Sequence, residues 1–236
     1  MSDSIIRVLS TRPLHAALVA SAALEGVAIE VVPFIETAPL SGPELLQRLE
    51  ELGRRRLTAV FTSSSAVEVV GPRVVASGVE AWSVFCIGGA TSQTVVKYFG
   101  EDAIVDTAGS ARELAERIIE VRPSGELFFF CGDLRREELP SLIREAGMEL
   151  QEVVVYQTVA TPREVGDDYD GILFFSPSAV ESYFSANWIS DEVVLFAIGP
   201  TTAGSIKKMA PINPIVIASA PEASVLIQQV IDHFKI

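Results

Sequence analysis

Three short motifs occur twice in this chain of 236 residues, in the same order, and this repeat constrains the fold more than any other feature. Three matches in one order seldom arise by chance, so the sequence predicts a duplicated protein. The second half lacks a counterpart of the segment 41–52. The paired motifs are Ser65-Ala-Val-Glu68 with Ser178-Ala-Val-Glu181, Ile87-Gly-Gly-Ala-Thr91 with Ile198-Gly-Pro-Thr-Thr202, and Glu25-Gly26 with Ala146-Gly147. Glu25-Gly26 and Ala146-Gly147 each precede an expected strand.

Short apolar segments alternate with longer amphipathic segments along the chain. The apolar segments are rich in Val, Ile and Phe without strict alternation, which is typical of parallel strands buried on both faces. Regular alternation of strands and helices predicts an α/β fold with parallel sheets. The expected strands are 5–10, 28–34, 57–62, 83–87, 103–106, 126–131, 149–157, 170–176, 193–198 and 214–218, and the expected helices are 13–25, 41–52, 65–76, 90–99, 110–121, 135–146, 178–186, 200–209 and 221–234.

Composition and charge narrow the class of ligand. Hydrophobic residues make up 49% of the chain, enough for a sizeable core. The net charge of −13 disfavours nucleic acid and anionic membrane surfaces as partners. No apolar run reaches the ~20 residues that span a bilayer, and no signal-peptide pattern opens the sequence. Two cysteines and two histidines disfavour a conventional zinc site, and we expect a reduced, cytoplasmic protein.

The residues that directly follow the expected strands are small, hydroxylated or glycine, and few are chemically reactive. Ligands of parallel α/β sheets bind at the carboxyl ends of the strands, so these loops form the predicted binding site. Helix N-termini that begin there present free N–H groups, which allows even an acidic protein to bind carboxylates or phosphates. Neither a GxxxxGK[ST] loop nor a G-x-G-x-x-G motif after the first strand is present, which disfavours nucleotide chemistry.

The loop hydroxyls have two possible roles. Ser65, Ser110 and Ser178 each precede a glutamate by three residues, a capping-box pattern that predicts helix capping rather than ligand binding. Hydroxyls one or two positions earlier are freer to contact a ligand, namely Thr62, Ser63 and Ser176.

Two larger side chains stand out in the same loops. Arg12 follows the first strand, where its guanidinium suits a bidentate contact with a carboxylate, although a solvated surface position fits equally well. Tyr156 lies near the end of a strand, where its phenol either donates a proton to a leaving hydroxyl or completes the core with its hydroxyl at the rim.

The strand-end motifs form a set that can be compared with known families. They are Leu9-Ser-Thr-Arg-Pro13, Val60-Phe-Thr-Ser-Ser-Ser-Ala-Val-Glu68, Ile87-Gly-Gly-Ala-Thr91, Phe130-Cys-Gly-Asp133 with Arg136-Glu-Glu-Leu-Pro140, Val155-Tyr-Gln-Thr158, Phe174-Phe-Ser-Pro-Ser-Ala-Val-Glu181 and Ala197-Ile-Gly-Pro-Thr-Thr202. Taken in this order, they resemble the motifs of the uroporphyrinogen-III synthase family. The resemblance implies a cyclising hydro-lyase without a cofactor, which takes the linear tetrapyrrole hydroxymethylbilane with its eight carboxylates. It also implies that ring D of this substrate is inverted and water is lost, which gives uroporphyrinogen III for haem biosynthesis.

Carried over residue by residue, the resemblance makes Tyr156 the catalytic candidate that assists departure of the hydroxyl. The remaining task is to position a flexible substrate. One departure is Ser64-Ser65, where many members have a proline, and we expect it to alter loop stiffness rather than chemistry. Thr62 is not among the carried-over residues, but its position directly after a strand makes it a further candidate. The predicted substrate-binding residues are then Arg12, Thr62, Ser63, Thr91, Ser176, Thr201 and Thr202.

The resemblance also implies discontinuous domains, two similar flavodoxin-like parallel sheets joined by a two-stranded connector with the cleft between them. One domain is expected to hold 1–34 and 161–236 and the other 35–160, with connector strands near 34–37 and 156–161. A single cut near residue 124 also gives five strands to each half, so strand counts alone do not decide between this division and the discontinuous one.

Two other functions stay open on the sequence alone. One is a non-catalytic binding protein or sensor for a polycarboxylate, and the other is a structural or partner-binding α/β module. For the enzyme we expect a monomer that acts on a small molecule, without a metal, nucleic acid or membrane as partner.

Overall fold

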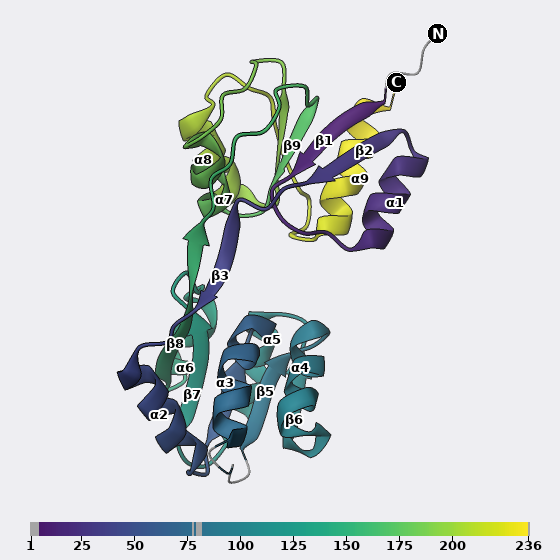
Figure 1. Ribbon diagram of the computed structural model, residues 1–236. Coiled ribbons are helices and arrows are strands. Elements are labelled where there is room, and N and C mark those ends of the chain that lie inside the picture. The colour runs from purple at the N-terminus through teal and green to yellow at the C-terminus, as the bar shows by residue number, and fades with distance from the viewer. Residues whose placement is uncertain (1–4, 77, 79–81, 236) are drawn as a thin grey trace. The chain divides into compact units, whose positions relative to one another are not determined.

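The computed structural model describes residues 5–76, 78 and 82–235, and its α/β architecture with parallel strands confirms the predicted fold class (Figure 1). The chain forms two compact units, one with the residues up to Glu36 and from Val159 onward, the other with Thr37–Thr158. It enters the second unit along β3 (Ile35–Pro39) and leaves it along β8 (Gln151–Ala160). These strands are neighbours in one sheet.

The first unit is built on a parallel sheet in the order β11-β10-β9-β1-β2. Its apolar residues form a layer on each side of the sheet, beneath α7 and α8 on one face and beneath α1 and α9 on the other. The elements are β1 (Ile6–Ser10), α1 (Ala16–Leu24), β2 (Val27–Val31), β9 (Gly171–Phe174), α7 (Pro177–Phe184), β10 (Val194–Ala197), α8 (Pro200–Met209), β11 (Ile215–Ile217) and α9 (Ala223–Phe234).

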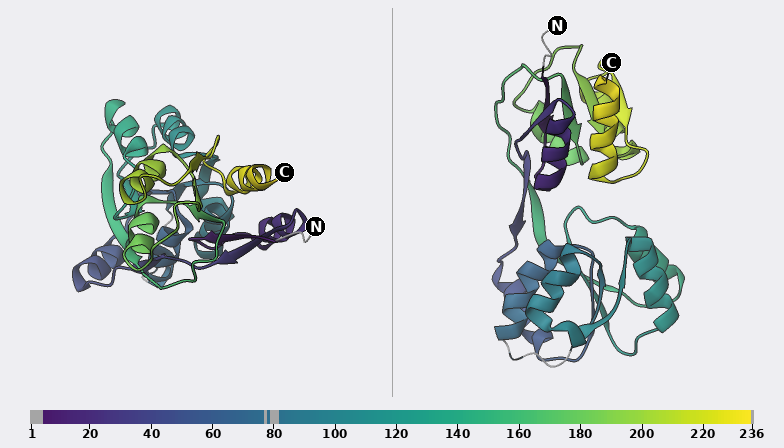
Figure 2. Two further views of the ribbon diagram at one scale, coloured as in Figure 1. Left: turned by 90° about the horizontal axis from the view of Figure 1, so that it is seen from above. Right: turned by 90° about the vertical axis from the view of Figure 1, so that its right-hand side faces the viewer.

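The second unit has a sheet in the order β3-β8-β7-β4-β5-β6, in which β8, β7, β4, β5 and β6 are parallel. Helices α2, α3 and α4 cover one face, and α5 and α6 cover the other (Figure 2). The further elements are α2 (Pro43–Gly53), β4 (Thr58–Phe61), α3 (Ser64–Ala76), β5 (Ser83–Ile87), α4 (Ala90–Phe99), the 3₁₀ turn η1 (Glu101–Ala103), β6 (Ile104–Ala108), α5 (Ala111–Val121), β7 (Leu127–Gly132) and α6 (Glu138–Glu145).

The predicted duplication is visible in the strand order. The repeated motifs pair β4 with β9 and β5 with β10, and the glycine motif pairs β8 with β2. When these partners are matched, the two sheets have the same spatial order of strands, β8-β7-β4-β5-β6 in one and β2-β1-β9-β10-β11 in the other. The two orders differ only in which strand comes first in the chain. Helix α2 has no counterpart in residues 161–170, as the missing segment predicted.

One expected strand is wrong in its extent. The segment 28–34 holds only β2, which ends at Val31, and β3 then begins at Ile35 as a separate strand. Pro33 explains the break because its fixed φ and missing N–H interrupt a ladder. Phe34 follows it, is fully buried and packs against the ring of Tyr183 at 5.1 Å between centroids, which anchors the chain where it leaves the first unit.

The core of the second unit is centred on aromatic residues of β7. Phe130 is fully buried and stacks on Phe61 at 5.3 Å and on Trp82 at 5.4 Å between ring centroids. These contacts join β7 to the end of β4 and to the residue before β5, and β7 in turn positions the strand-end loop that follows it. Among the described residues, the helices are all too short or too polar to cross a membrane.

Candidate functional site

The switch points of the two sheets lie beside four of the predicted binding residues. In the first unit β1 leads to β2 on one side, whereas β9 leads to β10 on the other. Ligands of open α/β sheets bind at such points. Arg12 follows β1 and Ser176 follows β9, so both lie at this switch point. The equivalent point of the second unit lies between β4 and β7, where Thr62 and Ser63 follow β4.

Arg12 is held at its switch point by an aromatic ring. Its guanidinium carbon lies 4.0 Å from the centroid of Phe175, a cation–π geometry. The surrounding protein desolvates the group and lowers the pKa of Arg12, but an arginine stays protonated. Within the described residues its guanidinium forms no ion pair, so its donors are available to an anion.

Two hydroxyls predicted to be free are helix caps. Ser63 Oγ accepts a hydrogen bond from the N–H of Ser65 at 3.1 Å, and Ser176 Oγ accepts one from the N–H of Ala179 at 3.2 Å. Helices α3 and α7 begin at Ser64 and Pro177, so Ser65 and Ser178 lie inside the first turn and their prediction as caps is wrong. The hydroxyl of Ser63 still keeps its proton to donate, whereas Ser176 Oγ also shares a hydrogen bond with Ser178 Oγ at 3.0 Å.

The capping box at Ser110 is confirmed. Its Oγ accepts a hydrogen bond from the N–H of Glu113 at 3.2 Å, and Glu113 Oε2 accepts one from Gly109 at 3.0 Å. We expect Ser110→Ala to lower the free energy of unfolding by about 1 kcal/mol, because α5 loses its N-terminal acceptor. Urea unfolding followed by circular dichroism measures this change. Ser110→Asn is the control and should retain wild-type stability, and equal losses in both variants would contradict the capping role.

The threonines lie at the starts of the helices that follow β5 and β10. Thr91 on α4 and Thr202 on α8 are both buried, at 6% and 3% exposure, whereas Thr201 is exposed. Gly89 and Gly199 precede these helices and offer no side-chain cap, so the first N–H groups of α4 and α8 lack that partner. The repeated motif therefore creates the same kind of polar helix start in each unit.

Tyr156 lines a cavity of about 270 Å³ inside the second unit. Its ring lies directly over Gly132, where an added Cβ would come within 2.5 Å of Tyr156 Cζ. Its backbone is also fixed, since its C=O accepts a hydrogen bond from Asp133 N at 3.1 Å. In the described chain the phenol forms no hydrogen bond and is free to donate one. The other residues around the cavity are Thr37, Pro39, Ser64, Ser65, Glu68 and Val69.

Sequence reasoning missed Glu68 as a cavity residue. Its carboxylate pairs with Lys97 Nζ at 3.0 Å and accepts a hydrogen bond from the phenol of Tyr98 at 2.5 Å. These two contacts hold the pKa of Glu68 below its ordinary value, the hydrogen bond from Tyr98 most of all. The motif that contains Glu68 was recognised, but it was interpreted as a capping box.

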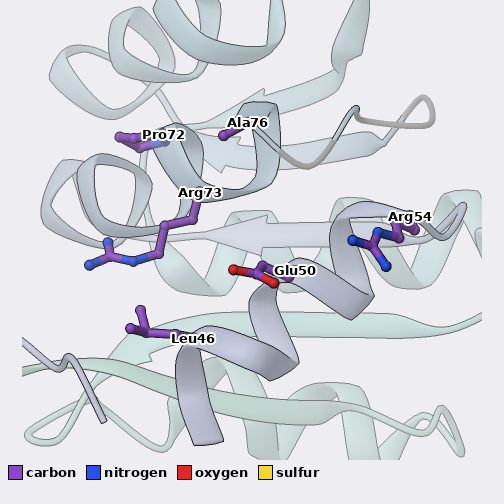
Figure 3. Close-up of a pocket in the computed structure, with 6 residues that line it drawn as sticks. All are labelled: Leu46, Glu50, Arg54, Pro72, Arg73 and Ala76. Carbon is purple, nitrogen blue, oxygen red and sulfur yellow. The ribbon is translucent and has the colours of Figure 1, made fainter. Parts of the chain in front are cut away.

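Two other cavities hold none of the predicted site residues. One, of about 650 Å³, lies between Leu46, Glu50 and Arg54 of α2 and Pro72, Arg73 and Ala76 of α3 (Figure 3). The second, of about 410 Å³, lies in the first unit and is lined largely by acidic groups of 167–170 and Glu192.

Cys86 and Cys131 are both buried, and neither forms a disulfide within the described residues. Burial raises the pKa of Cys86 and of Cys131 to about 11 each, so both thiols are protonated at neutral pH. A protonated, buried thiol is a poor nucleophile, and the free phenol of Tyr156 remains the better candidate for proton transfer.

Fold and site together define a class, the α/β proteins of two similar units that bind small molecules at the carboxyl ends of parallel strands. The family model described as "Uroporphyrinogen-III synthase HemD" matches residues 16–228. Because the match spans most of the chain, the protein belongs to the uroporphyrinogen-III synthase family, cyclising lyases of haem biosynthesis. The predicted resemblance is thereby confirmed.

Individual relatives agree with this assignment. A protein of Chlorobaculum parvum named uroporphyrinogen-III synthase is 28% identical over 223 residues, which cover 86% of this chain and 89% of the relative. The fold matches the crystal structure of uroporphyrinogen-III synthetase from Helicobacter pylori, with a TM-score of 0.67, 14% identity and coverage of 97% and 99% of the two chains. A mutant uroporphyrinogen III synthase from Thermus thermophilus matches with a TM-score of 0.53, 17% identity and coverage of 97% and 98%.

Proposed function

We propose that this chain converts hydroxymethylbilane to uroporphyrinogen III, with Tyr156 as the acid that assists departure of the hydroxyl. The observation that carries the proposal is a phenol without a hydrogen-bond partner among the described residues, held over Gly132 in a cavity. A positioned acid at a leaving group accelerates a reaction by about 10²–10⁴-fold. The inversion of ring D then depends on how the protein holds the rest of the substrate.

The substrate carboxylates require donors rather than reactive groups. We assign them to Arg12 and to the strand-end loops, where uncapped helix starts and hydroxyl groups provide hydrogen bonds without adding net positive charge. This explains how a chain with a net charge of −13 binds a polyanion. The hydroxyls we assign to this role are those of Thr62, Ser63, Thr91, Ser176, Thr201 and Thr202.

The isomer of the product tests the function. Hydroxymethylbilane closes spontaneously without inversion, so a reaction without protein yields type I product. We expect the protein to give type III, detected after oxidation to uroporphyrin and chromatographic separation of the isomers. Type I alone would contradict the proposal. Tight binding of hydroxymethylbilane without conversion would favour the non-catalytic binding protein.

Arg12→Ala tests the carboxylate contact. We expect substrate binding to weaken by about 1.5–3 kcal/mol, the range for hydrogen bonds to charged groups. The measurement is KM for hydroxymethylbilane at constant ionic strength. Lys208→Ala is the control, because Lys208 is an exposed cation without an ion pair in the described chain, and its loss should leave KM unchanged. Equal KM for the wild type and Arg12→Ala would show that Arg12 is a solvated surface residue that does not bind the substrate.

We also propose that the enzyme works as a cytoplasmic monomer, without nucleic acid or a membrane as partner. The negative net charge supports the last two points because it opposes approach to other polyanions. Each unit also has buried apolar layers of its own on both sheet faces, as expected for units that need no second copy. Sedimentation equilibrium in the presence and absence of substrate tests the monomer.

A further inference from the structure

Among the described residues that line the cavity of Tyr156, the ionised side chain is Glu68. Lys97 Nζ lies 3.0 Å from Oε1 and 3.3 Å from Oε2, and the phenol of Tyr98 donates to Oε2 at 2.5 Å. A carboxylate has about four acceptor positions. Lys97 is the only partner of Oε1 within the described chain, so this oxygen can accept a further hydrogen bond from a ligand.

The position of Glu68 is fixed by its neighbours on α4. The ring of Tyr98 lies against Gly71 of α3, where an added Cβ would come 2.5 Å from Tyr98 Cγ. Lys97 also lies over the ring of Tyr98, at 4.5 Å from its centroid. The carboxylate is therefore oriented before any substrate binds, which is what electrostatic stabilisation of a transition state requires.

The repeat shows that the fold does not need this arrangement. The counterparts of Glu68 and Lys97 in the first unit are Glu181 and Lys208, on α7 and α8. Neither counterpart forms a side-chain hydrogen bond or an ion pair within the described residues, yet α7 and α8 pack together as α3 and α4 do. Met209 replaces Tyr98 in this copy. The charged pair is thus confined to the unit that carries Tyr156.

We propose that Glu68 is a further catalytic residue, whose carboxylate accepts a hydrogen bond from the N–H of the pyrrole ring that loses its hydroxyl. The proposal rests on the proposed function. When the C–O bond breaks, the proton of Tyr156 passes to the departing oxygen, which leaves as water. The nitrogen lone pair forms a C=N bond, the ring π electrons shift, and the pair displaced at the substituted carbon forms the exocyclic C=C bond, so positive charge builds up on the N–H. The N–H proton then passes to Glu68 and on to solvent, and Tyr156 regains a proton from solvent, so the net loss is one water.

The carboxylate of Glu68 also bears on which part of the substrate enters the cavity. Its unused acceptor position can take a hydrogen bond from a pyrrole N–H but not from an ionised substrate carboxylate, so it favours the orientation in which the hydroxymethyl group faces Tyr156. Glu68 thereby stabilises developing positive charge, whereas Arg12 and the helix starts bind negative charge.

Glu68→Gln tests the proposal because the amide keeps the shape of the side chain and removes its charge. We expect kcat for type III product to fall about tenfold, equivalent to about 1.4 kcal/mol of transition-state stabilisation, with KM unchanged. Glu181→Gln is the matched control at the equivalent position of the repeat and should have the kcat of the wild type. Tyr98→Phe keeps the carboxylate and its Lys97 partner but removes one of the contacts that orient it, so it should lower kcat by less than Glu68→Gln does.

Two results would overturn the inference alone. One is a wild-type kcat in Glu68→Gln, and the other is a loss in Tyr98→Phe as large as that in Glu68→Gln, which would make the role of Glu68 structural. A wild-type protein that yields only type I product would instead overturn the proposed function and this inference with it. Thermal unfolding of each variant separates loss of chemistry from loss of folded protein.

Discussion

Tyr156→Phe is expected to lower kcat by about 100-fold, because the ring stays in place while the proton donor is lost. The phenol has no hydrogen-bond partner in the described chain, so its removal leaves no buried group unsatisfied, and the variant should fold as the wild type does. The measurement is the initial rate of type III formation at saturating hydroxymethylbilane. The expected KM is close to that of the wild type, since the donor acts on the leaving group.

Thr37→Val is the matched control for this variant. Thr37 lines the same cavity, and its change removes a hydroxyl without touching the phenol. We expect it to keep most of the wild-type rate. A wild-type rate in Tyr156→Phe would remove Tyr156 from the mechanism, and a loss confined to KM would assign it to binding rather than to catalysis.

The order and type of the elements could be predicted because buried parallel strands and amphipathic helices have distinct patterns. The repeat added long-range information, since matching Ser65-Ala-Val-Glu68 to Ser178-Ala-Val-Glu181 correctly paired β4 with β9. The apolar pattern did not predict β3, and only the family resemblance implied a connector strand near 34–37. The five residues of β3 are half-buried or exposed, so it lacks the apolar pattern that marks the other strands, and its pairing with β8 depends on contacts distant in sequence.

The site was predictable only to the level of the loops. The rule that ligands bind at the carboxyl ends of strands selected Arg12, Ser63 and Ser176 as candidates, and these follow β1, β4 and β9, but the rule does not say which hydroxyls cap a helix. Capping depends on where the helix begins, and the cap lies at Ser63, two residues before the predicted Ser65. Glu68 could not be predicted as a cavity residue because its partners lie on another helix, about 30 residues away in the sequence.

Gly132→Ala is expected to lower kcat about as much as Tyr156→Phe does, although it changes a residue that cannot take part in the chemistry. The new methyl group would lie within 2.5 Å of Tyr156 Cζ and 2.9 Å of its hydroxyl oxygen, so the ring must move away from the backbone of β7. Displacement of a catalytic group by about 1 Å is enough to cost about 100-fold in rate. The measurement is again the rate of type III formation, with circular dichroism to confirm that the sheet is intact.

Comparison with Tyr156→Phe in a double variant decides whether Gly132 acts through the phenol. If it does, Gly132→Ala in the Tyr156→Phe background should lower kcat little further, because the displaced ring no longer carries the donor. Gly204→Ala is the control, since an added Cβ at this helical position meets no atom within 4 Å and should preserve the rate. Fully multiplicative losses in the double variant would show that Gly132 supports the strand in general. A near-silent second substitution would show that its missing side chain is what places the phenol of Tyr156 in the cavity.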